Sequence, residues 1–399
     1  MAELLQQLNC RTSSNGSTTL VTDSDAWDAL AVDWDRLAGD VAFRQFAWCR
    51  AWWNAYANER RQLAIMVCRD ESARIVGIAP FVREASWQRG VALCLLGGGE
   101  ACGDRLSLLV EPGCESQVVA ALCEALHAWR DAWGWDCIYL DGVEADDPLT
   151  AALADRMAQS GAHLASRNDA ARWAFPLPDT YEGYVAGLGK RMRRFVRQTQ
   201  RDLERSDYGL EVRRPSSPHE TSAMFAQLVE LHGMRWQEDD QSGAFASPYF
   251  KKFLSEVAQS WFANGSLRLF VLSLDGEPAA AAIGVRTGEV FSAFLLGRNP
   301  KFDDVRPGWM LNLAMIASAI DEGANQFDFL RGDEEYKARL GAQPVAQRRL
   351  TITAPGPVNG VRVLAGAGRV VAKRTRDRLR NHASQSLLLK AATRFALAT

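Results

Sequence analysis

The segment FDFLRGDEEYKARLG, residues 327–341, joins an apolar, strand-like run to a dense group of ionisable side chains. The apolar part ends at Arg331-Gly332, and six polar or charged residues crowd the positions that follow: Asp333, Glu334, Glu335, Tyr336, Lys337 and Arg339. A plain surface loop can carry such a group, but chains often deliver their chemistry where a strand ends. We therefore take this segment as the first candidate for a functional site.

Around this segment, the expected elements of the second half of the chain repeat those of the first half. Apolar periodicity predicts helix, helix, three strands, helix, strand, helix and strand in each half. RWAFPLP (172–178) is expected to close the first sheet, and QRRLTITAP (347–355) the second. The sequence thus predicts an α/β (α+β) fold, in which a mixed, mainly antiparallel sheet flanked by helices occurs twice.

The expected division of the chain has four parts. Residues 1–20 are polar and rich in Ser, Thr and Asn, which favours a disordered leader. The two α/β modules are expected at 21–180 and 181–355, and a basic helical tail at 356–399. From residue 361 onward there are nine Lys or Arg and one acid, so this segment carries about +8 although the whole chain carries −2.

Composition and motifs exclude several classes of function. A net charge of −2 gives no overall attraction to DNA. The eight cysteines form no CxxC pair and lack histidines at ligand spacing, so we expect reduced thiols, no metal and a cytoplasmic location. The N-terminus does not look like a secretion signal, and no apolar run is long enough to span a membrane. P-loop, HExxH and GxSxG motifs are absent.

A strongly basic helix is expected between the two halves. In LGKRMRRFVRQTQRDLERS (188–206), apolar residues recur at helical spacing, and seven Lys or Arg cover the other faces. It is either a solvated helix packed by its apolar stripe, or a wall that binds the anionic part of a phosphorylated ligand.

Five stretches of the second half resemble, in order, the GNAT-like acetyltransferases called CelD/BcsL-like (or BioF2-like), which are related to the FemAB peptidoglycan aminoacyltransferases. They are KRMRRFVRQTQRDLE (190–204), LHGMRW (231–236), LDGEPAAAAIGVRTGEVFSAFLLGRNPKF (274–302), VRPGWMLNLAMI (305–316) and GANQFDFLRGDEEYKARLG (323–341). The last two are the most specific. Residues 40–140 fit the first half of the family more loosely.

The resemblance implies two tandem GNAT-like modules, of which the second keeps the site for an acyl donor, acetyl-CoA or another acyl-CoA. In such folds the donor lies against the strand VFSAFLLGRNP, and its pyrophosphate sits at the start of the next helix. Unpaired N–H groups and the helix dipole favour anions there. The residues implied in donor binding are Arg298, Arg306, Pro307, Gly308, Trp309, Arg331 and Lys337. Trp309 departs from the family's usual small residue, and the whole stretch could also be a simple Pro-Gly helix start.

Acylation of an amine needs a base for the attacking group, donors for the oxyanion and an acid for the leaving thiolate. Asp333 or Glu334 could act as the base or hold the amine, and Tyr336 could protonate the sulfur. The structural alternative is a helix N-cap at Asp333. His232, Arg235 and Trp236 lie on one helical face and could bind an acceptor sugar or amine, or simply pack the helix end.

The leading hypothesis is a cytoplasmic acyltransferase that acts on an amine or hydroxyl of a sugar or related metabolite, with exopolysaccharide or cellulose production as the context that the resemblance implies. One alternative is a FemAB-type transferase that uses aminoacyl-tRNA. Another is a non-catalytic scaffold on a degenerate GNAT frame. The basic tail could touch the inner face of an anionic membrane, although a packed or disordered segment is the simpler interpretation.

Overall fold

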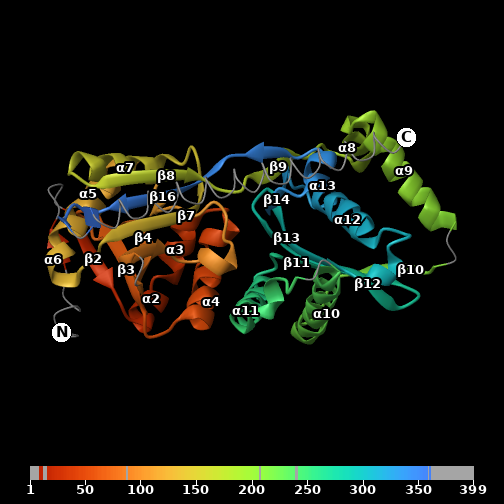
Figure 1. Ribbon diagram of the computed structural model, residues 1–399, viewed down its shortest axis with the longest axis horizontal. Coiled ribbons are helices and arrows are strands. Elements are labelled where there is room, and N and C mark those ends of the chain that lie inside the picture. Colours follow the sequence, from red (N-terminus) through yellow and green to blue (C-terminus); the bar gives the residue numbers. More distant parts are fainter. Residues whose placement is uncertain are drawn as a thin grey trace, which may run out of the picture.

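The chain folds into two sheets that follow each other along the long axis of the molecule, with helices on their faces (Figure 1). This computed structural model describes residues 9–11, 16–86, 89–205, 208–238, 241–357 and 359–360. The predicted α/β fold with two sheets flanked by helices is confirmed.

The first sheet has the strand order β1-β2-β3-β4-β5-β7-β16-β8 within the described residues, and β6 pairs with β4. Every neighbouring pair is antiparallel except β5 with β7. The strands are β1 (Asn9–Arg11), β2 (Ser17–Val21), β3 (Arg61–Arg69), β4 (Ile75–Ser86), β5 (Gly90–Leu95), β6 (Leu109–Val110), β7 (Cys137–Glu144), β8 (His163–Asn168) and β16 (Gln347–Thr353).

The second sheet has the order β10-β11-β12-β13-β14-β9-β15, and here β13 and β14 form the parallel pair. Its strands are β9 (Arg172–Pro176), β10 (Leu210–Arg213), β11 (Leu267–Leu274), β12 (Glu277–Thr287), β13 (Val290–Arg298), β14 (Gln326–Arg331) and β15 (Gln343–Val345). The one parallel pair occupies the same position in both sheets. In each, three consecutive antiparallel strands are followed by a helical connection, and the next strand in the sheet order then pairs in parallel with the third. One structural unit therefore occurs twice, as the order of elements predicted.

The two sheets exchange their closing strands, which the sequence did not predict. β9 lies between β14 and β15 in the second sheet, and β16 lies between β7 and β8 in the first. The expectation that RWAFPLP closes the first sheet and QRRLTITAP the second was wrong. The apolar pattern of a strand indicates which of its faces is buried. It does not indicate which other strand its backbone will hydrogen-bond to, because every strand offers the same N–H and C=O groups. As a result, residues of one module lie inside the other.

The helices follow the predicted order, and polar residues cap the starts of two of them. Asp147 accepts from the N–H of Thr150, and Ser217 from that of Glu220, each just before a proline. The helices are α2 (Ser24–Asp28), α3 (Ala31–Ala38), α4 (Phe46–Tyr56), α5 (Glu115–Ala128), α6 (Arg130–Trp133), α7 (Pro148–Gln159), α8 (Tyr181–Gly187), α9 (Lys190–Arg205), α10 (Pro218–Gln237), α11 (Pro248–Ala263), α12 (Pro307–Asp321) and α13 (Glu335–Arg339).

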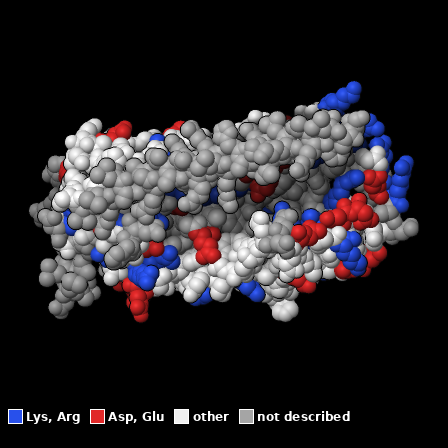
Figure 2. Space-filling model, viewed as in Figure 1, with Lys and Arg blue, Asp and Glu red and all other residues white. Residues whose placement is uncertain are grey.

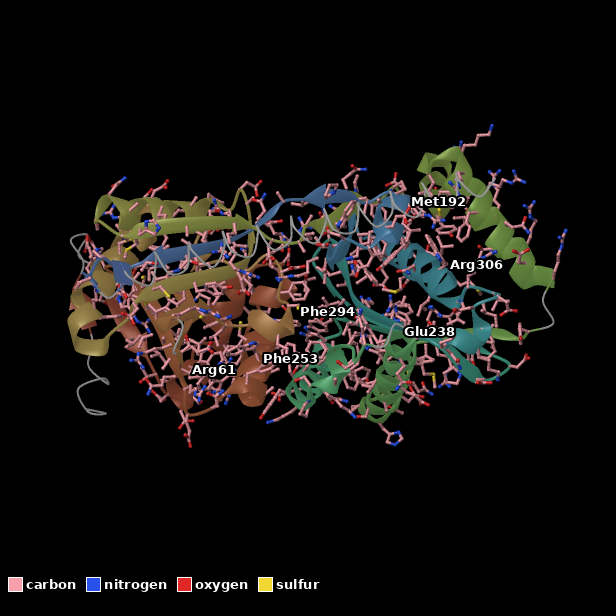
Figure 3. The ribbon with its side chains drawn as sticks, in the orientation of Figure 1. Arg61, Met192, Glu238, Phe253, Phe294 and Arg306 are labelled. Atoms are coloured by element: carbon pink, nitrogen blue, oxygen red, sulfur yellow. The ribbon has the colours of Figure 1, made fainter. Side chains whose placement is uncertain are left out.

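A single hydrophobic core joins the first module to one face of the second sheet. The Trp48 ring on α4 lies 4.7 Å from Phe253 on α11 and 5.5 Å from Phe294 on β13. Phe253 and Phe294 are labelled at this junction in Figure 3. A separate core between α8, α9, α12 and the other face of the second sheet completes the fold. The second sheet is thus covered on both faces, and the first module is packed firmly against it.

The predicted leader at 1–20 needs a correction, because β1 and β2 fall inside it. Thr18 is buried and its hydroxyl lies 3.5 Å from the sulfur of Cys68, and Leu20 belongs to the core. Thr and Val suit a strand at a sheet edge, although the polar composition resembles that of a disordered segment. The basic tail from residue 361 onward lies outside the described residues. In the part of the chain that is described, no helix is long and apolar enough to cross a membrane.

Candidate active site

The central feature of the second module is a gap between its two parallel strands. β13 and β14 pair only from Val290–Gln326 to Ser292–Asp328. Beyond Ser292, β13 runs on to Arg298 while bound to β12 alone, and a register shift at Ile283/Gly284 accompanies the divergence. The backbone edge of β13 that faces β14 therefore has no strand partner there, so its N–H groups can bind a ligand. This is the strand that the resemblance implied as the donor strand.

The helix α12 begins at the open end of this gap. Its N-cap, Arg306, has φ 57° and makes no capping hydrogen bond with its side chain. A Cβ at Gly308 would lie 3.5 Å from Leu296 and 3.7 Å from Arg298, so the first turn rests against the end of β13. Pro307 has no N–H and the N–H of Trp309 donates to the Arg306 carbonyl, so the N–H of Gly308 and the helix dipole are what make this position attractive to an anion.

Two arginines stand at the same opening, and both already have carboxylate partners. Arg306 lies 3.5 Å from Asp202 of α9, and its guanidinium is 5.3 Å from the ring centre of Phe195. Arg298 is paired with Asp303 and, at 2.9 Å, with Glu238 at the end of α10. Figure 3 labels Glu238 and Arg306. A guanidinium has five N–H donors, so either arginine could bind a phosphate beside its exposed carboxylate or in exchange for it.

An aromatic contact joins the start of α12 to the polar turn after β14, residues 331–337, which is called the corner below. The Trp309 ring lies 6.3 Å from Tyr336 on α13 and 4.9 Å from Phe195 on α9. Tyr336 also lies 5.6 Å from Phe329 of β14. Burial and the charge of Glu334 raise the pKa of the Tyr336 phenol, and the charge of Arg235 lowers it less strongly. The phenol is therefore protonated at neutral pH, and Arg235 lies within its electrostatic reach.

The buried side chain of Lys337, which is only 2% exposed, holds the backbone of the corner in place. Its ammonium donates to the carbonyls of Arg331 at 2.8 Å, Gly332 at 3.2 Å and Leu330 at 3.3 Å, and it pairs with Glu334 at 2.8 Å. Leu330 and Gly332 have φ of 57° and 122°, so the turn needs such support. These contacts give Lys337 a structural task, in place of the phosphate contact implied by the resemblance.

The two acids of the corner differ in their surroundings. Asp333 is exposed and its carboxylate makes no hydrogen bond to the described residues. Glu334 folds back onto Lys337 and occupies the N-cap position of α13 without a capping hydrogen bond from its side chain. The alternative interpretation of Asp333 as the N-cap was therefore wrong. Asp333 is the acid that is free to meet a ligand.

A buried network of charges behind the corner was missed by the sequence analysis. The N–H of Arg331 donates to Asp104 of the first module at 2.7 Å, and its guanidinium pairs with the same carboxylate. Asp328 pairs with Arg172 of the exchanged strand β9 at 2.6 Å, and Arg172 pairs with Glu144. Arg331 thus anchors the end of β14 to the first module instead of reaching the opening.

Burial raises the pKa of Asp328 to about 6, although Arg172 opposes the shift. The only signal in the sequence was an acid between Phe327 and Phe329 in an otherwise apolar strand. Asp328 accepts from the nearby Leu330 N–H at 2.8 Å, but its charged partner Arg172 is more than a hundred positions away, so the identity of that partner required the structure.

The predicted acceptor group lies on the other side of β13. His232 of α10 is 2% exposed, and its Nε2 accepts from the indole N–H of Trp236 at 2.9 Å. The guanidinium of Arg235 lies 4.6 Å from the Trp236 ring centre. Burial, with help from Arg235, lowers the pKa of His232 to about 4. The imidazole is therefore neutral with its proton on Nδ1, and that atom has no hydrogen-bond partner.

We expect His232 to make the protein less stable in mild acid. The unfolded imidazole takes up a proton near pH 6.5 and the folded one only near pH 4, so stability is lost as the pH falls through this window. Between pH 7.5 and pH 5 the loss is about 2 kcal/mol. Urea unfolding at both pH values checks this, with His232→Gln as the comparison. An equal pH dependence in the variant would contradict the assignment, since Asp328 titrates in both proteins.

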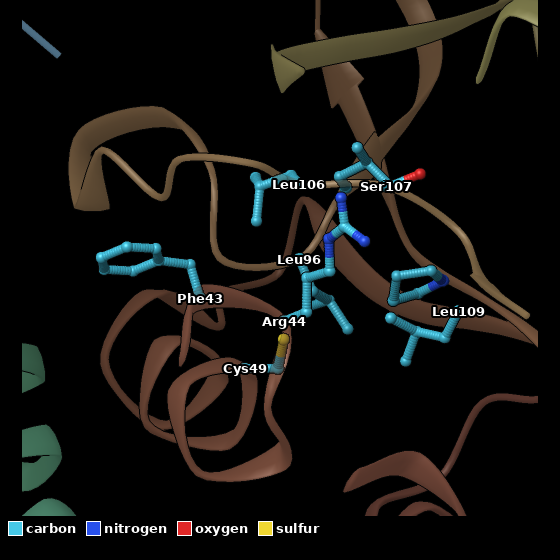
Figure 4. A pocket seen from close by; sticks show the side chains of 9 residues that line it. Phe43, Arg44, Cys49, Leu96, Leu106, Ser107 and Leu109 are labelled. Atoms are coloured by element: carbon cyan, nitrogen blue, oxygen red, sulfur yellow. The ribbon is translucent and has the colours of Figure 1, made fainter. Parts of the chain in front are cut away.

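The small enclosed cavity of the first module is not a second site. It is lined by Phe43, Arg44, Cys49, Leu96 and Ser107 among others (Figure 4). Its volume of about 10 Å³ has room for roughly one water molecule. Within the described residues, no group of three or more His, Cys, Asp or Glu could hold a metal ion.

Comparison with known sequence families gives a match for residues 190–338, to the family described as "Acetyltransferase (GNAT) domain". These residues include the diverging strands, the start of α12 and the corner at 331–337. Over these residues the chain is similar to GNAT acetyltransferase domains. No curated protein matches the chain in sequence.

Solved structures resemble the chain over most of its length. FemX has a TM-score of 0.56 and 12% identity over 83% of this chain and 96% of its own. A conserved protein of unknown function from Bacteroides thetaiotaomicron has a TM-score of 0.51 and 14% identity, over 84% of this chain and 99% of its own. The C-terminal domain of a putative lysylphosphatidylglycerol synthetase from Agrobacterium fabrum has a TM-score of 0.50 and 13% identity, over 86% of this chain and 97% of its own. At such identities the likeness concerns the fold, and it extends beyond residues 190–338 into the first module.

Proposed function

We propose that the GNAT domain transfers an acyl group, acetyl in the first instance, from acyl-CoA to an amine or hydroxyl. The observation that carries the proposal is the gap between β13 and β14, which opens beside the uncapped start of α12. A long thioester needs both parts, an anion site for its pyrophosphate and a slot for its extended arm. The free backbone edge of β13 can hydrogen-bond that arm as a strand would.

In this proposal Tyr336 and Asp333 carry the proton transfers. Asp333, or a water beside it, accepts a proton from the attacking amine or hydroxyl. The nucleophile then adds to the thioester carbonyl, whose oxygen is stabilised by N–H groups of β13. When the carbon–sulfur bond breaks, the protonated phenol of Tyr336 gives its proton to the leaving thiolate.

For the acceptor we propose a sugar or a related polar metabolite, held by His232, Arg235 and Trp236. The unpartnered Nδ1–H of His232 can donate one hydrogen bond, and an indole with a guanidinium over it is a surface on which a sugar ring can stack. Placement in the CelD/BcsL-like branch, a cytoplasmic location and a role in exopolysaccharide production remain proposals that rest on the sequence motifs. The same holds for a membrane contact through the tail.

Replacing Arg306 by glycine tests the donor site with little disturbance of the fold. The left-handed backbone at this position suits glycine, so Arg306→Gly removes the guanidinium without adding strain. We expect acetyl-CoA affinity to fall about tenfold, as the loss of one charge-assisted hydrogen bond to phosphate implies. Isothermal titration of the wild-type protein and the variant measures this.

Arg306→Lys is the matched control, because it keeps the positive charge; it should recover part of the affinity. Equal affinities for acetyl-CoA in all three proteins would show that the pyrophosphate binds elsewhere. No binding to the wild-type protein would reject acetyl-CoA as the donor.

A FemAB-type transferase using aminoacyl-tRNA is the second candidate, and the exposed face of α9 favours it. Six of its basic residues are exposed and have no acidic partner among the described residues: Lys190, Arg191, Arg194, Arg197, Arg201 and Arg205. Such a row suits a polyanion. Transfer of a labelled aminoacyl group from charged tRNA, without competition by acetyl-CoA, would favour this candidate over the first.

A further inference from the structure

A second opening, distinct from the donor gap, lies between α8, α9, α12, the edge strand β10 and its neighbour β11. This pocket has a volume of about 210 Å³, and its walls are almost entirely apolar. They include Leu210, Val212, Met310, Leu313 and Ala317. Since one water molecule needs roughly 10–15 Å³, the space is far larger than a packing defect.

One polar group faces this pocket without a partner. The Thr199 side chain on α9 is 3% exposed and lines the pocket, and its hydroxyl has no hydrogen-bond partner in the structure. Water inside such apolar walls finds few hydrogen bonds, so an apolar chain with an ester or other acceptor group near Thr199 fits the lining better.

The surface around the opening combines positive charge with exposed apolar residues. The exposed basic face of α9, defined by the six residues named above, forms one border. Figure 2 shows basic residues at this end of the molecule, with acidic residues beside them. Tyr208, Leu210 and Val212 form the other border and are 36%, 40% and 38% exposed. β10 is an edge strand, so these three side chains are open to a partner, and the exposed Glu211 lies between Leu210 and Val212 in the chain.

We propose that this end of the protein docks on an anionic membrane surface and takes one phospholipid acyl chain into the pocket. The basic face of α9 would meet the phosphate headgroups, each cation adding to the attraction. The side chains of Tyr208, Leu210 and Val212 would enter the interface, where a tyrosine is well placed. Glu211 alternates with Leu210 and Val212 along β10, so its carboxylate would stay in water. The charge on α9 and the apolar pocket both fit a lipid, whereas RNA would use the charge alone. The contact is independent of acyl transfer and of the tail.

Sedimentation of the full-length protein with vesicles tests the proposal, without any acyl donor present. We expect binding to vesicles of phosphatidylcholine mixed with phosphatidylglycerol and little binding to phosphatidylcholine alone. Reversing Arg194, Arg197 and Arg201 to Glu should weaken binding roughly 100-fold or more. Inorganic phosphate should not compete, because it lacks the apolar chain.

The pocket has its own variant, Ala317→Phe, which fills the cavity and leaves the charge unchanged. It should weaken vesicle binding about tenfold, while thermal melting shows that it folds. Reversal of three exposed basic residues elsewhere, Arg60, Arg167 and Lys251, should change little and serves as the matched control. Unchanged binding in the α9 variant or in Ala317→Phe overturns the proposal. Binding that disappears only when residues 361–399 are removed overturns it too, because the contact then belongs to the tail.

Discussion

Gly297→Ala is expected to destabilise the protein by about 3 kcal/mol or more. A Cβ at this position of β13 would lie 2.2 Å from the backbone N of His232 and 2.6 Å from its Cα. Both atoms belong to the backbone of α10, so no side-chain rotation can relieve the overlap. The helix would have to move away from the sheet and take the predicted acceptor group with it. Denaturant unfolding, read as the change in free energy, measures the effect.

Gly308→Ala provides the matched control in the same part of the fold. The nearest atoms to its Cβ lie 3.5 Å and 3.7 Å away, which is ordinary contact, and alanine favours a helix. We expect stability to be unchanged or to rise by roughly 0.5–1 kcal/mol. If Gly297→Ala were as stable as Gly308→Ala, α10 would not approach β13 as closely as described.

Tyr336→Phe is expected to lower kcat by roughly 100-fold to 1,000-fold, the range typical of a lost general acid. The phenylalanine ring keeps the packing against Trp309 and Phe329, so stability and donor affinity should stay close to those of the wild-type protein. Acetyl transfer measured at saturating donor, together with the Kd for acetyl-CoA, separates the chemical step from binding.

The outcome for Tyr336 also decides between catalysis and a scaffold. If kcat and Kd are both unchanged, another group protonates the sulfur and the assignment of Tyr336 is wrong. If Kd rises and kcat does not fall, the hydroxyl of Tyr336 helps to bind the donor and does not act as the acid. A wild-type protein that binds acetyl-CoA but transfers nothing to any amine or sugar would favour the non-catalytic scaffold.

The sequence predicted the repeated unit and the local features from which the donor site is proposed, because these features depend on neighbouring residues. Pro307 and Gly308 indicate the start of a helix. The apolar run that ends at Arg331 indicates a strand followed by a polar corner. Helical spacing also predicted α9 and the shared face of His232 and Arg235. Each of these features depends on residues that are close together in the chain, and periodicity and capping rules describe such local relationships.

What the sequence could not predict depends on contacts between distant segments. The exchange of β9 and β16 is invisible in a pattern that records only which face is buried. Arg331 and Lys337 looked available for phosphate, and only the folded chain shows Asp104 and three backbone carbonyls beside them. The charged residues of the corner thus divide into supports, such as Lys337, and groups that remain free, such as Asp333.

The central claim is that acyl-CoA lies between β13 and β14 with its pyrophosphate at the start of α12. Hydrogen–deuterium exchange with and without acetyl-CoA tests it most directly, because backbone N–H groups are the proposed contacts. The account predicts slower exchange on binding in peptides covering 293–298 and 307–312, with no change in 63–82 of the first module. Protection confined to the first module, with both second-module segments unaffected, would contradict it.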